Sequence, residues 1–384
     1  MTTSETPTTS RDLNWIKQAL QSAVEVECST LPLYLSALFS LEVQNYTTYN
    51  VIRSVAMEEM VHVAIAANML AALGGTPQLK YLKLSYPMHG LPGGAEPDLR
   101  VGLAQLSRSQ LKHFMRIEKP EFLLRPTLPN ETYPTIADFY EAIRQAIIRN
   151  EDTVRAAVKA ALEAGGPPNQ VGDIIGFKTI TSSPDVDTVN QLLNGMEEIV
   201  HQGEGTTRES LFADAVSQNE ESHYAKFAEL YHGASYQDPH PAIELTLETE
   251  HEFFKGYPIG WPTVINTLAV PADGYARILK LDPAGKDVTE DLIAFDKEYS
   301  SILAALDAVW NGPADKWWPT LGGAVGSMMK LRVLCCFKIM RRQIPADIVA
   351  QLSDLYPDEI DYLNTYADLQ KPVFYGPRFL NTNS

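Results

Sequence analysis

Two short motifs place a glutamate three residues before a histidine. Glu59 and His62 occur in EEMVH, and Glu220 and His223 occur in NEESHY. Residues three apart on a helix lie on one face, so each pair can direct a carboxylate oxygen and an imidazole nitrogen at one point. Such donors among apolar residues favour a divalent metal, because the cation balances charges that are otherwise costly to bury. The two motifs therefore predict a metal site.

A two-metal site of this kind needs single glutamates from two further helices. Glu27 is the candidate in the first predicted helix, with Glu25 as an alternative on a different face. Glu204 is the candidate in a later helix, where Glu197 and His201 remain open as replacements for it or additions to it. Two ExxH pairs with two such glutamates make up the dinuclear carboxylate site of ferritin-like four-helix bundles.

Other polar residues near the motifs are interpreted as supporting groups. Tyr34 lies two helical turns after Glu27, nearly in register, and is a possible hydrogen-bond donor to a ligand. Glu58 and Glu221 alternate with the ligand candidates, so we expect them to face solvent or a residue that orients a ligand. The mixed oxygen and nitrogen donors favour two iron ions, with manganese possible, over an all-thiolate zinc site.

The elements that must position these residues are helices. Apolar residues spaced by three and four predict a helix over 12–41, bent at Pro32, and a second that ends at the glycines 74 and 75. The same spacing recurs further along the chain, over 135–166, 185–205, 209–233, 288–312 and 321–344. The sequence therefore predicts an all-α fold, a four-helix bundle with a long turn-rich insertion and a C-terminal helical extension.

The domain organisation follows from where this spacing is interrupted. We expect a flexible tail at 1–11, a metal-binding bundle at 12–240 and a C-terminal loop and helical extension packed on it at 241–384. Glycine and proline mark the insertion, at about 76–131, as turns with minor strand content. Since only sixteen residues separate Glu204 from Glu220, we expect the metals near one end of the bundle, beside a pocket walled by the turn-rich segment LSYPMHGLPGG and the C-terminal helices.

Charge and composition limit the partners. The net charge of −17 argues against nucleic acid and anionic membranes, which need a basic face, and favours a small-molecule substrate. No apolar run appears long enough for a membrane helix. The three cysteines, Cys28, Cys335 and Cys336, are an odd set without metal-type spacing, which fits a reducing cytoplasm.

A further set of motifs is specific in combination. It comprises TLPLYLSALFSL, SVAMEEMVHVAIAANMLAALGGTP, YPMHGLPGG, FMRIEKPE, YPTIADFYEAI, QGEG, NEESHYAKF and YGPRF. From about Leu13 to the end of the chain, these motifs resemble the ferritin-like domain of the iminophenylpyruvate dimer synthase family, which includes the violacein-pathway enzyme and the chromopyrrolate synthases. The large members carry a long region before this domain, so the chain is similar to the stand-alone members.

The resemblance implies a metal-dependent oxidoreductase of secondary metabolism. Its substrate would be a small organic, amino-acid-derived or other natural-product intermediate, its co-reactant dioxygen or peroxide, and its reaction possibly the oxidative coupling of an imine. Bundles of this kind often pair, so a homodimer is possible. Two alternatives remain: a ferritin-like protein that oxidises and stores iron, and a metal-free binding scaffold. The insertion and the C-terminal extension disfavour storage, and the intact ligand set disfavours the scaffold.

Overall fold

The computed structural model confirms the all-α class. It describes residues 11–42, 46–120, 132–163, 170–172, 179–180, 187–205, 221–237, 243 and 245–383. Within these ranges the only named strands are β1 (Met88–His89) and β2 (Arg100–Val101), which pair antiparallel with Met88 opposite Val101. Ten of the residues expected to form the flexible tail, 1–10, lie outside the described ranges.

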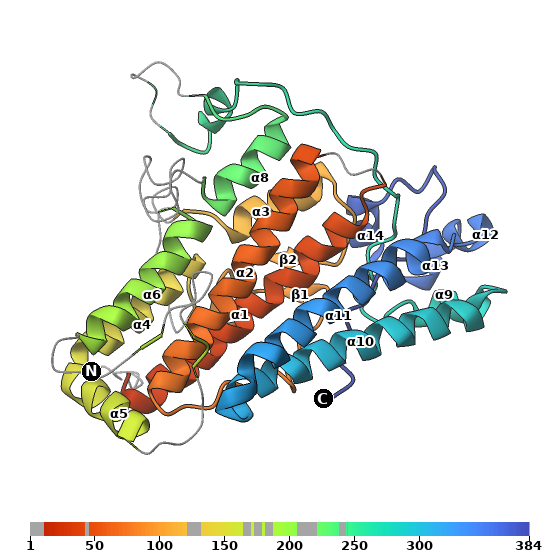
Figure 1. The fold of residues 1–384 in the computed structure, drawn as a ribbon. Coiled ribbons are helices and arrows are strands. Elements are labelled where there is room, and N and C mark those ends of the chain that lie inside the picture. Colours follow the sequence, from red (N-terminus) through yellow and green to blue (C-terminus); the bar gives the residue numbers. More distant parts are fainter. Residues whose placement is uncertain are drawn as a thin grey trace, which may run out of the picture.

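Two long helices, α1 (Leu13–Phe39) and α2 (Tyr46–Ala72), lie side by side at the centre of the molecule (Figure 1). Asp12 caps α1 by accepting a hydrogen bond from the backbone N–H of Trp15 at 3.0 Å. After α2, Gly74 adopts a φ of 72°, a left-handed conformation that glycine reaches without a steric penalty. Both predicted helices are therefore present, and α1 includes Pro32.

Two groups of helices pack along different parts of this central pair. α4 (Ile136–Arg149) contacts α1, and α6 (Thr188–Gly203) contacts α2, while α5 (Glu151–Glu163) lies across their end. α3 (Arg108–Ile117) packs against α8 (His223–His232), which contacts α2 further along its length (Figure 1). The bundle thus surrounds the middle of α1 and α2 rather than only one end.

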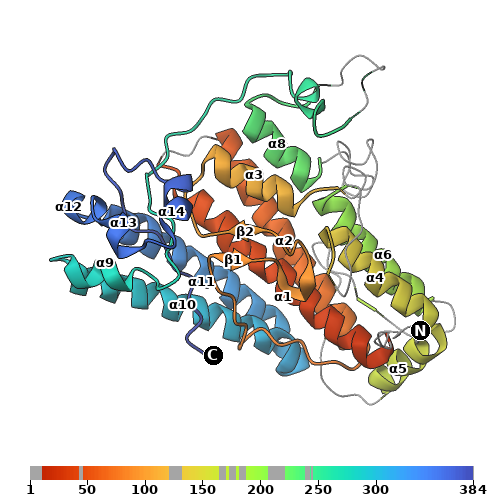
Figure 2. The same ribbon diagram turned by 180° about the vertical axis from the view of Figure 1, so that it is seen from behind.

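The insertion differs from its prediction. Figure 2 shows α3 beside the small β ribbon, and this helix belongs to the bundle core rather than to turns. Ser107 caps it by accepting the N–H of Gln110, and Leu111, Phe114 and Met115 form its buried face. The ten-residue helix was missed because it lies between glycine- and proline-rich stretches. The rest of the insertion includes the short 3₁₀ helix η1 (Pro92–Gly94), which packs on α1.

Two C-terminal helices occur where the spacing predicted them. α10 (Gly285–Asn311) and α11 (Trp317–Phe337) pack on each other, and α11 also contacts α1. The shorter elements of this region are η3 (Glu250–Phe253), α9 (Ala276–Leu281), η4 (Ala314–Lys316), η5 (Ile339–Arg341), α12 (Ala346–Val349), α13 (Leu352–Leu355) and α14 (Ile360–Tyr366). The division of the chain into domains stays a prediction.

Two helical stretches have the length and composition of a membrane helix. They are Thr47–Ala72 and Ala314–Arg341. In the most apolar 18-residue window of the first, 78% is buried in the protein, whereas 17% is buried in that of the second. The first is a core helix of the bundle. The expectation that no segment is long and apolar enough to cross a membrane is therefore wrong by length and composition. The absence of a membrane partner stays a prediction.

Candidate metal centre

Five side chains of metal-ligand type meet at the middle of α1 and α2. Glu27 comes from α1, Glu59 and His62 come from α2, Glu118 follows α3 directly, and His223 is the first residue of α8. Each of the five is at most 3% exposed. These residues lie beside the last residues of α6 and include the first residue of α8, and the position of the metals near one end of the bundle stays a prediction.

His223 turns one ring nitrogen outward and one into this cluster. Nε2 lies 2.8 Å from Oε2 of Glu58, which also pairs with Lys226 at 2.8 Å. In the neutral ring that binds a metal, Nε2 would donate to Glu58 and Nδ1 would carry the lone pair. Nδ1 lies 2.9 Å from Oε1 of Glu59 and 3.6 Å from Oε2 of Glu118, but no described residue gives this buried atom a hydrogen bond of good geometry. It is therefore placed as a metal ligand would be.

His62 has the same arrangement. Its Nε2 lies 3.0 Å from Oε1 of Gln202, and its Nδ1 lies 3.6 Å from Oε2 of Glu27 and 3.9 Å from Oε2 of Glu59. The two imidazole rings stack with centroids 5.4 Å apart. Outward hydrogen bonds that fix the tautomer and the ring plane are typical of metal-binding histidines.

Hydroxyl groups hold two of the carboxylates. Thr30 donates to Oε2 of Glu59 at 3.1 Å, and Tyr140 of α4 donates to Oε1 of Glu27 at 2.7 Å. Burial, followed by the charge of Glu27, raises the pKa of Tyr140 well above its usual value, so this phenol remains a hydrogen-bond donor. These bonds leave one oxygen of Glu27 and one of Glu59 directed toward the histidines.

Glu118 was not among the predicted site residues. The Tyr34 hydroxyl donates to its Oε1, and its Oε2 lies against Gly203, where an added Cβ would come within 3.1 Å. The only signal in the sequence was its place in the FMRIEKPE motif, because no neighbouring histidine marks it as a ligand. Tyr34, expected as a possible donor to a ligand, bonds to this unpredicted carboxylate.

The ionisable groups at the centre depend on one another. Burial and the charge of Glu118 raise the pKa of Glu59 to about 7, against the opposing effect of the two histidines. Burial lowers the pKa of His62 and of His223, but the hydrogen bonds and charges of the surrounding glutamates outweigh it and raise both. The surroundings thus favour the protonated forms of Glu59, His62 and His223, and bound cations would replace those protons.

Two further residues, Glu204 and Glu220, were predicted as ligands. Glu204, the residue after α6, is buried, and its Oε1 accepts the N–H of Ala137 at 2.5 Å in the first turn of α4. Glu220 lies outside the described residues. Ser222, the residue directly before α8, has an extended conformation and caps this helix. Ligation by Glu204 and Glu220 stays a prediction.

The structure separates the alternatives that the sequence left open. Glu25 is half-buried and accepts a hydrogen bond from Gln21 at 3.2 Å, on another face of α1 than Glu27. Glu197 is exposed on α6, whereas His201 is half-buried on the same helix. Burial raises the pKa of Glu58, but the hydrogen bond from His223 and the charge of Lys226 outweigh it and hold that pKa at about 2.

The geometry fits a divalent cation. Ligand atoms of Glu59, His62 and His223 all lie within 4.8 Å of one another, and Glu27 and Glu118 lie against the same histidines. Carboxylate oxygens with imidazole nitrogens suit iron or manganese.

Glu221, expected to face solvent or a supporting partner, is half-buried, and burial with the charge of Glu229 raises its pKa to about 7.

Comparison with known proteins agrees with the helical bundle. A family model described as Ferritin-like matches residues 20–232. The structure is similar to that of a ferritin-like protein from Caulobacter vibrioides, with a TM-score of 0.57 and 20% sequence identity over 85% of this chain and 96% of that one. At this identity the similarity shows the fold alone. No curated protein matches the chain.

Proposed function

The chain belongs to the ferritin-like family, and on this basis we propose that it is a metal-dependent oxidoreductase with a dinuclear iron centre. One observation carries the proposal: three carboxylates and two imidazoles from four helices converge in the core, at Glu27, Glu59, His62, Glu118 and His223. Several buried carboxylates without a counter-charge destabilise a fold, and two divalent cations would balance them. Manganese is the alternative metal.

Two iron ions at this position would supply binding of dioxygen or peroxide and the exchange of electrons. The residues of the chain would hold the two ions and orient the side chains that bind them. Glu58 and Gln202 fix the planes of the two imidazoles, and Tyr34 and Tyr140 fix Glu118 and Glu27. Burial of every one of the five ligand candidates keeps water away, which strengthens the electrostatic interactions at the centre.

The proposed substrate is a small organic, amino-acid-derived or other natural-product intermediate. Support comes from the motifs shared with the iminophenylpyruvate dimer synthase family, since Glu59, His62, Glu118, Gly203 and His223 all fall within them. Oxidative coupling of an imine is the specific reaction that this resemblance favours. The proposal includes action in the cytoplasm without nucleic acid or membrane, and a possible homodimer.

Metal analysis of protein purified without chelators tests the proposal. About two irons per chain would support it, because the bundle site holds two metals. A large excess of iron over protein would instead support storage, and a metal-free protein that also fails to take up iron or manganese would support a binding scaffold. Consumption of dioxygen by the reduced iron form only when an organic substrate is added would separate an oxidoreductase from a storage protein.

A second test concerns the ligands themselves. We expect Glu59→Ala and His223→Ala to lose metal while circular dichroism shows a folded helical protein. Glu197→Ala is the matched control, because this glutamate is exposed on α6 and should not affect metal content. Full metal content in the folded Glu59 and His223 variants would show that the proposed centre is wrong.

A further inference from the structure

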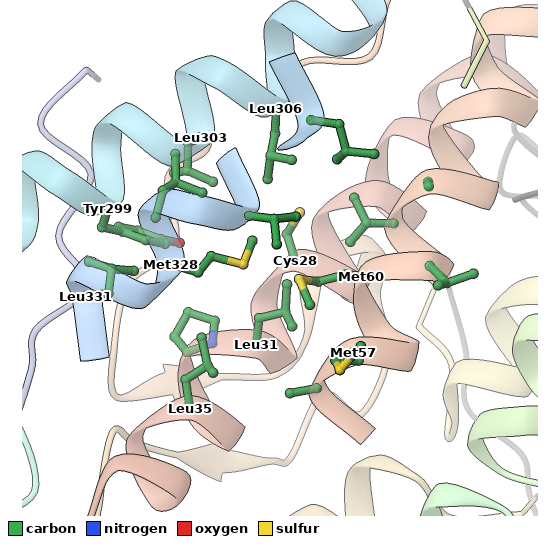
Figure 3. A pocket seen from close by; sticks show the side chains of 18 of the residues that line it. Cys28, Leu31, Leu35, Met57, Met60, Tyr299, Leu303, Leu306, Met328 and Leu331 are labelled. Carbon is green, nitrogen blue, oxygen red and sulfur yellow. The ribbon is translucent and has the colours of Figure 1, made fainter. Parts of the chain in front are cut away.

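A cavity of about 390 Å³ lies between the α1–α2 pair and the α10–α11 pair (Figure 3). Cys28 and Leu31 line it from α1, Met60 from α2, Leu303 from α10 and Met328 from α11. None of the five ligand candidates of the metal centre lines it, and the pocket expected beside the metals stays a prediction. Its volume is within the range of small-molecule sites.

The lining of this cavity selects against charged molecules. Among the described residues that form it, none is charged, and most are leucine, valine, methionine or aromatic residues. A charged ligand would lose its hydration without gaining a counter-charge. A hydrocarbon surface, in contrast, would leave water for a matching apolar surface. Methionines such as Met60 and Met328 also adapt their shape readily to an occupant.

Tyr299 of α10 adds one polar group. It is 8% exposed, its ring packs edge-on against Phe379 with centroids 5.2 Å apart, and no residue in the described part of the chain hydrogen-bonds its hydroxyl. Figure 3 shows this hydroxyl oxygen on the cavity side of the ring. Trp310, which also lines the cavity, donates its N–H to Asn68 at 2.9 Å.

The Tyr299 hydroxyl is not among the fully buried polar atoms that lack a partner, so it is accessible from the cavity that its side chain lines and can donate to an oxygen of an occupant. Burial also raises the pKa of Tyr299, so the phenol remains a neutral donor. We propose that this cavity binds an uncharged, mainly hydrocarbon molecule with one oxygen atom that accepts a hydrogen bond from Tyr299, such as an alcohol, a ketone or an ester. This site is distinct from the metal centre and does not depend on its activity.

Binding is measured on the full chain with N-phenyl-1-naphthylamine, a neutral probe that fluoresces in apolar surroundings. Displacement by 1-octanol, n-octane and octanoate gives three affinities. We expect octanol and octane to displace the probe and octanoate to do so least. Tyr299→Phe should lower the affinity for octanol about fivefold, as the loss of one hydrogen bond implies, and leave the affinity for octane unchanged. This variant keeps the ring and its contact with Phe379.

A second variant, Leu31→Trp, fills the cavity and should abolish displaceable binding in a protein that circular dichroism shows to be folded. Met329→Gln and Val333→Gln are controls, because both residues are exposed on α11 and neither lines the cavity. The proposal is overturned by an absence of saturable binding, by equal loss in the two controls, or by unchanged octanol affinity in Tyr299→Phe. Probe affinity that falls as protein concentration rises would show that a second copy covers the cavity, and would also overturn it.

Discussion

Tyr34 and Glu118 are 84 residues apart in the chain and are joined by a hydrogen bond inside the bundle, from the Tyr34 hydroxyl to Oε1 of Glu118. Burial, followed by the charge of Glu118, raises the pKa of Tyr34 well above its usual value. The phenol therefore donates at any ordinary pH. Its donation fixes the orientation of a carboxylate whose other oxygen lies 3.6 Å from His223.

We predict that Tyr34→Phe weakens metal binding about 10- to 100-fold without abolishing it, because Glu118 remains but is no longer oriented. Competition with a chromophoric chelator measures the affinity. Tyr86→Phe is the control, since the buried Tyr86 hydroxyl donates to the carbonyl of Ser29 and not to a ligand candidate. That control should lose about 1 kcal/mol of stability and no metal affinity. Equal metal affinity in wild type and Tyr34→Phe would contradict the prediction.

We predict that Glu118→Gln lowers the metal content per chain, because the amide removes the negative charge of a carboxylate in contact with His223. Elemental analysis by mass spectrometry measures the content, and a thermal melt establishes that the protein is folded. Glu25→Gln makes the same chemical change on another face of α1 and should keep the wild-type metal content. If the two variants bind metal equally, Glu118 is not a ligand.

Gly203→Ala should disturb the same carboxylate sterically. Its new Cβ would lie 3.1 Å from Oε2 of Glu118, so the carboxylate must move and metal affinity should fall. Gly195→Ala on the same helix would meet Cγ2 of Ile65 at 3.2 Å, a similar approach to an apolar side chain. It should cost about 1–3 kcal/mol of stability and leave metal affinity unchanged. Chelator competition measures the metal affinity of both variants, and urea unfolding measures their stability. If metal affinity falls equally in Gly203→Ala and Gly195→Ala, the contact between Gly203 and Glu118 does not position a ligand.

Arg378 and Asp296 form a buried ion pair away from the metal centre, and Asp296 is 1% exposed. We predict that Arg378→Met lowers the free energy of unfolding by about 3–5 kcal/mol at neutral pH, because Asp296 is left as an uncompensated buried charge. Urea unfolding measures the change. Lys371→Met, which breaks an exposed pair with Asp368, should cost less than about 1 kcal/mol.

The cost of Arg378→Met should depend on pH. Burial raises the pKa of Asp296 above its usual value, and Arg378 opposes that rise, so the variant should have a still higher pKa. A group with a raised folded pKa contributes stability below its unfolded pKa and loses it as pH rises through its folded pKa. The difference between variant and wild type should therefore shrink toward about pH 4. A difference that is constant with pH, or no recovery in the Asp296→Asn, Arg378→Met double variant, would contradict the argument.

Local sequence patterns were sufficient for the longest helices and for part of the centre. α1, α2, α10 and α11 were predictable because a long apolar stripe at helical spacing must be buried against a neighbour. Glu59 and His62 were predictable as a pair because both lie within α2, where the spacing by itself determines their common face. Glu27 was predictable as a third ligand candidate because it lies in α1, a helix whose apolar stripe had to pack on α2.

Only the tertiary structure decided what depends on contacts between elements. Glu118 ends a helix that lies within a turn-rich stretch, and it reaches the centre because α3 packs on α8, which no local pattern records. His223 reaches the centre as the first residue of α8, a helix that Ser222 caps, and this helix start was not visible in the sequence spacing. The cavity and the Tyr299 hydroxyl arise where α10 and α11 meet α1 and α2. Spacing within one helix is fixed by covalent geometry, whereas a site shared by several helices is fixed by how their side chains pack.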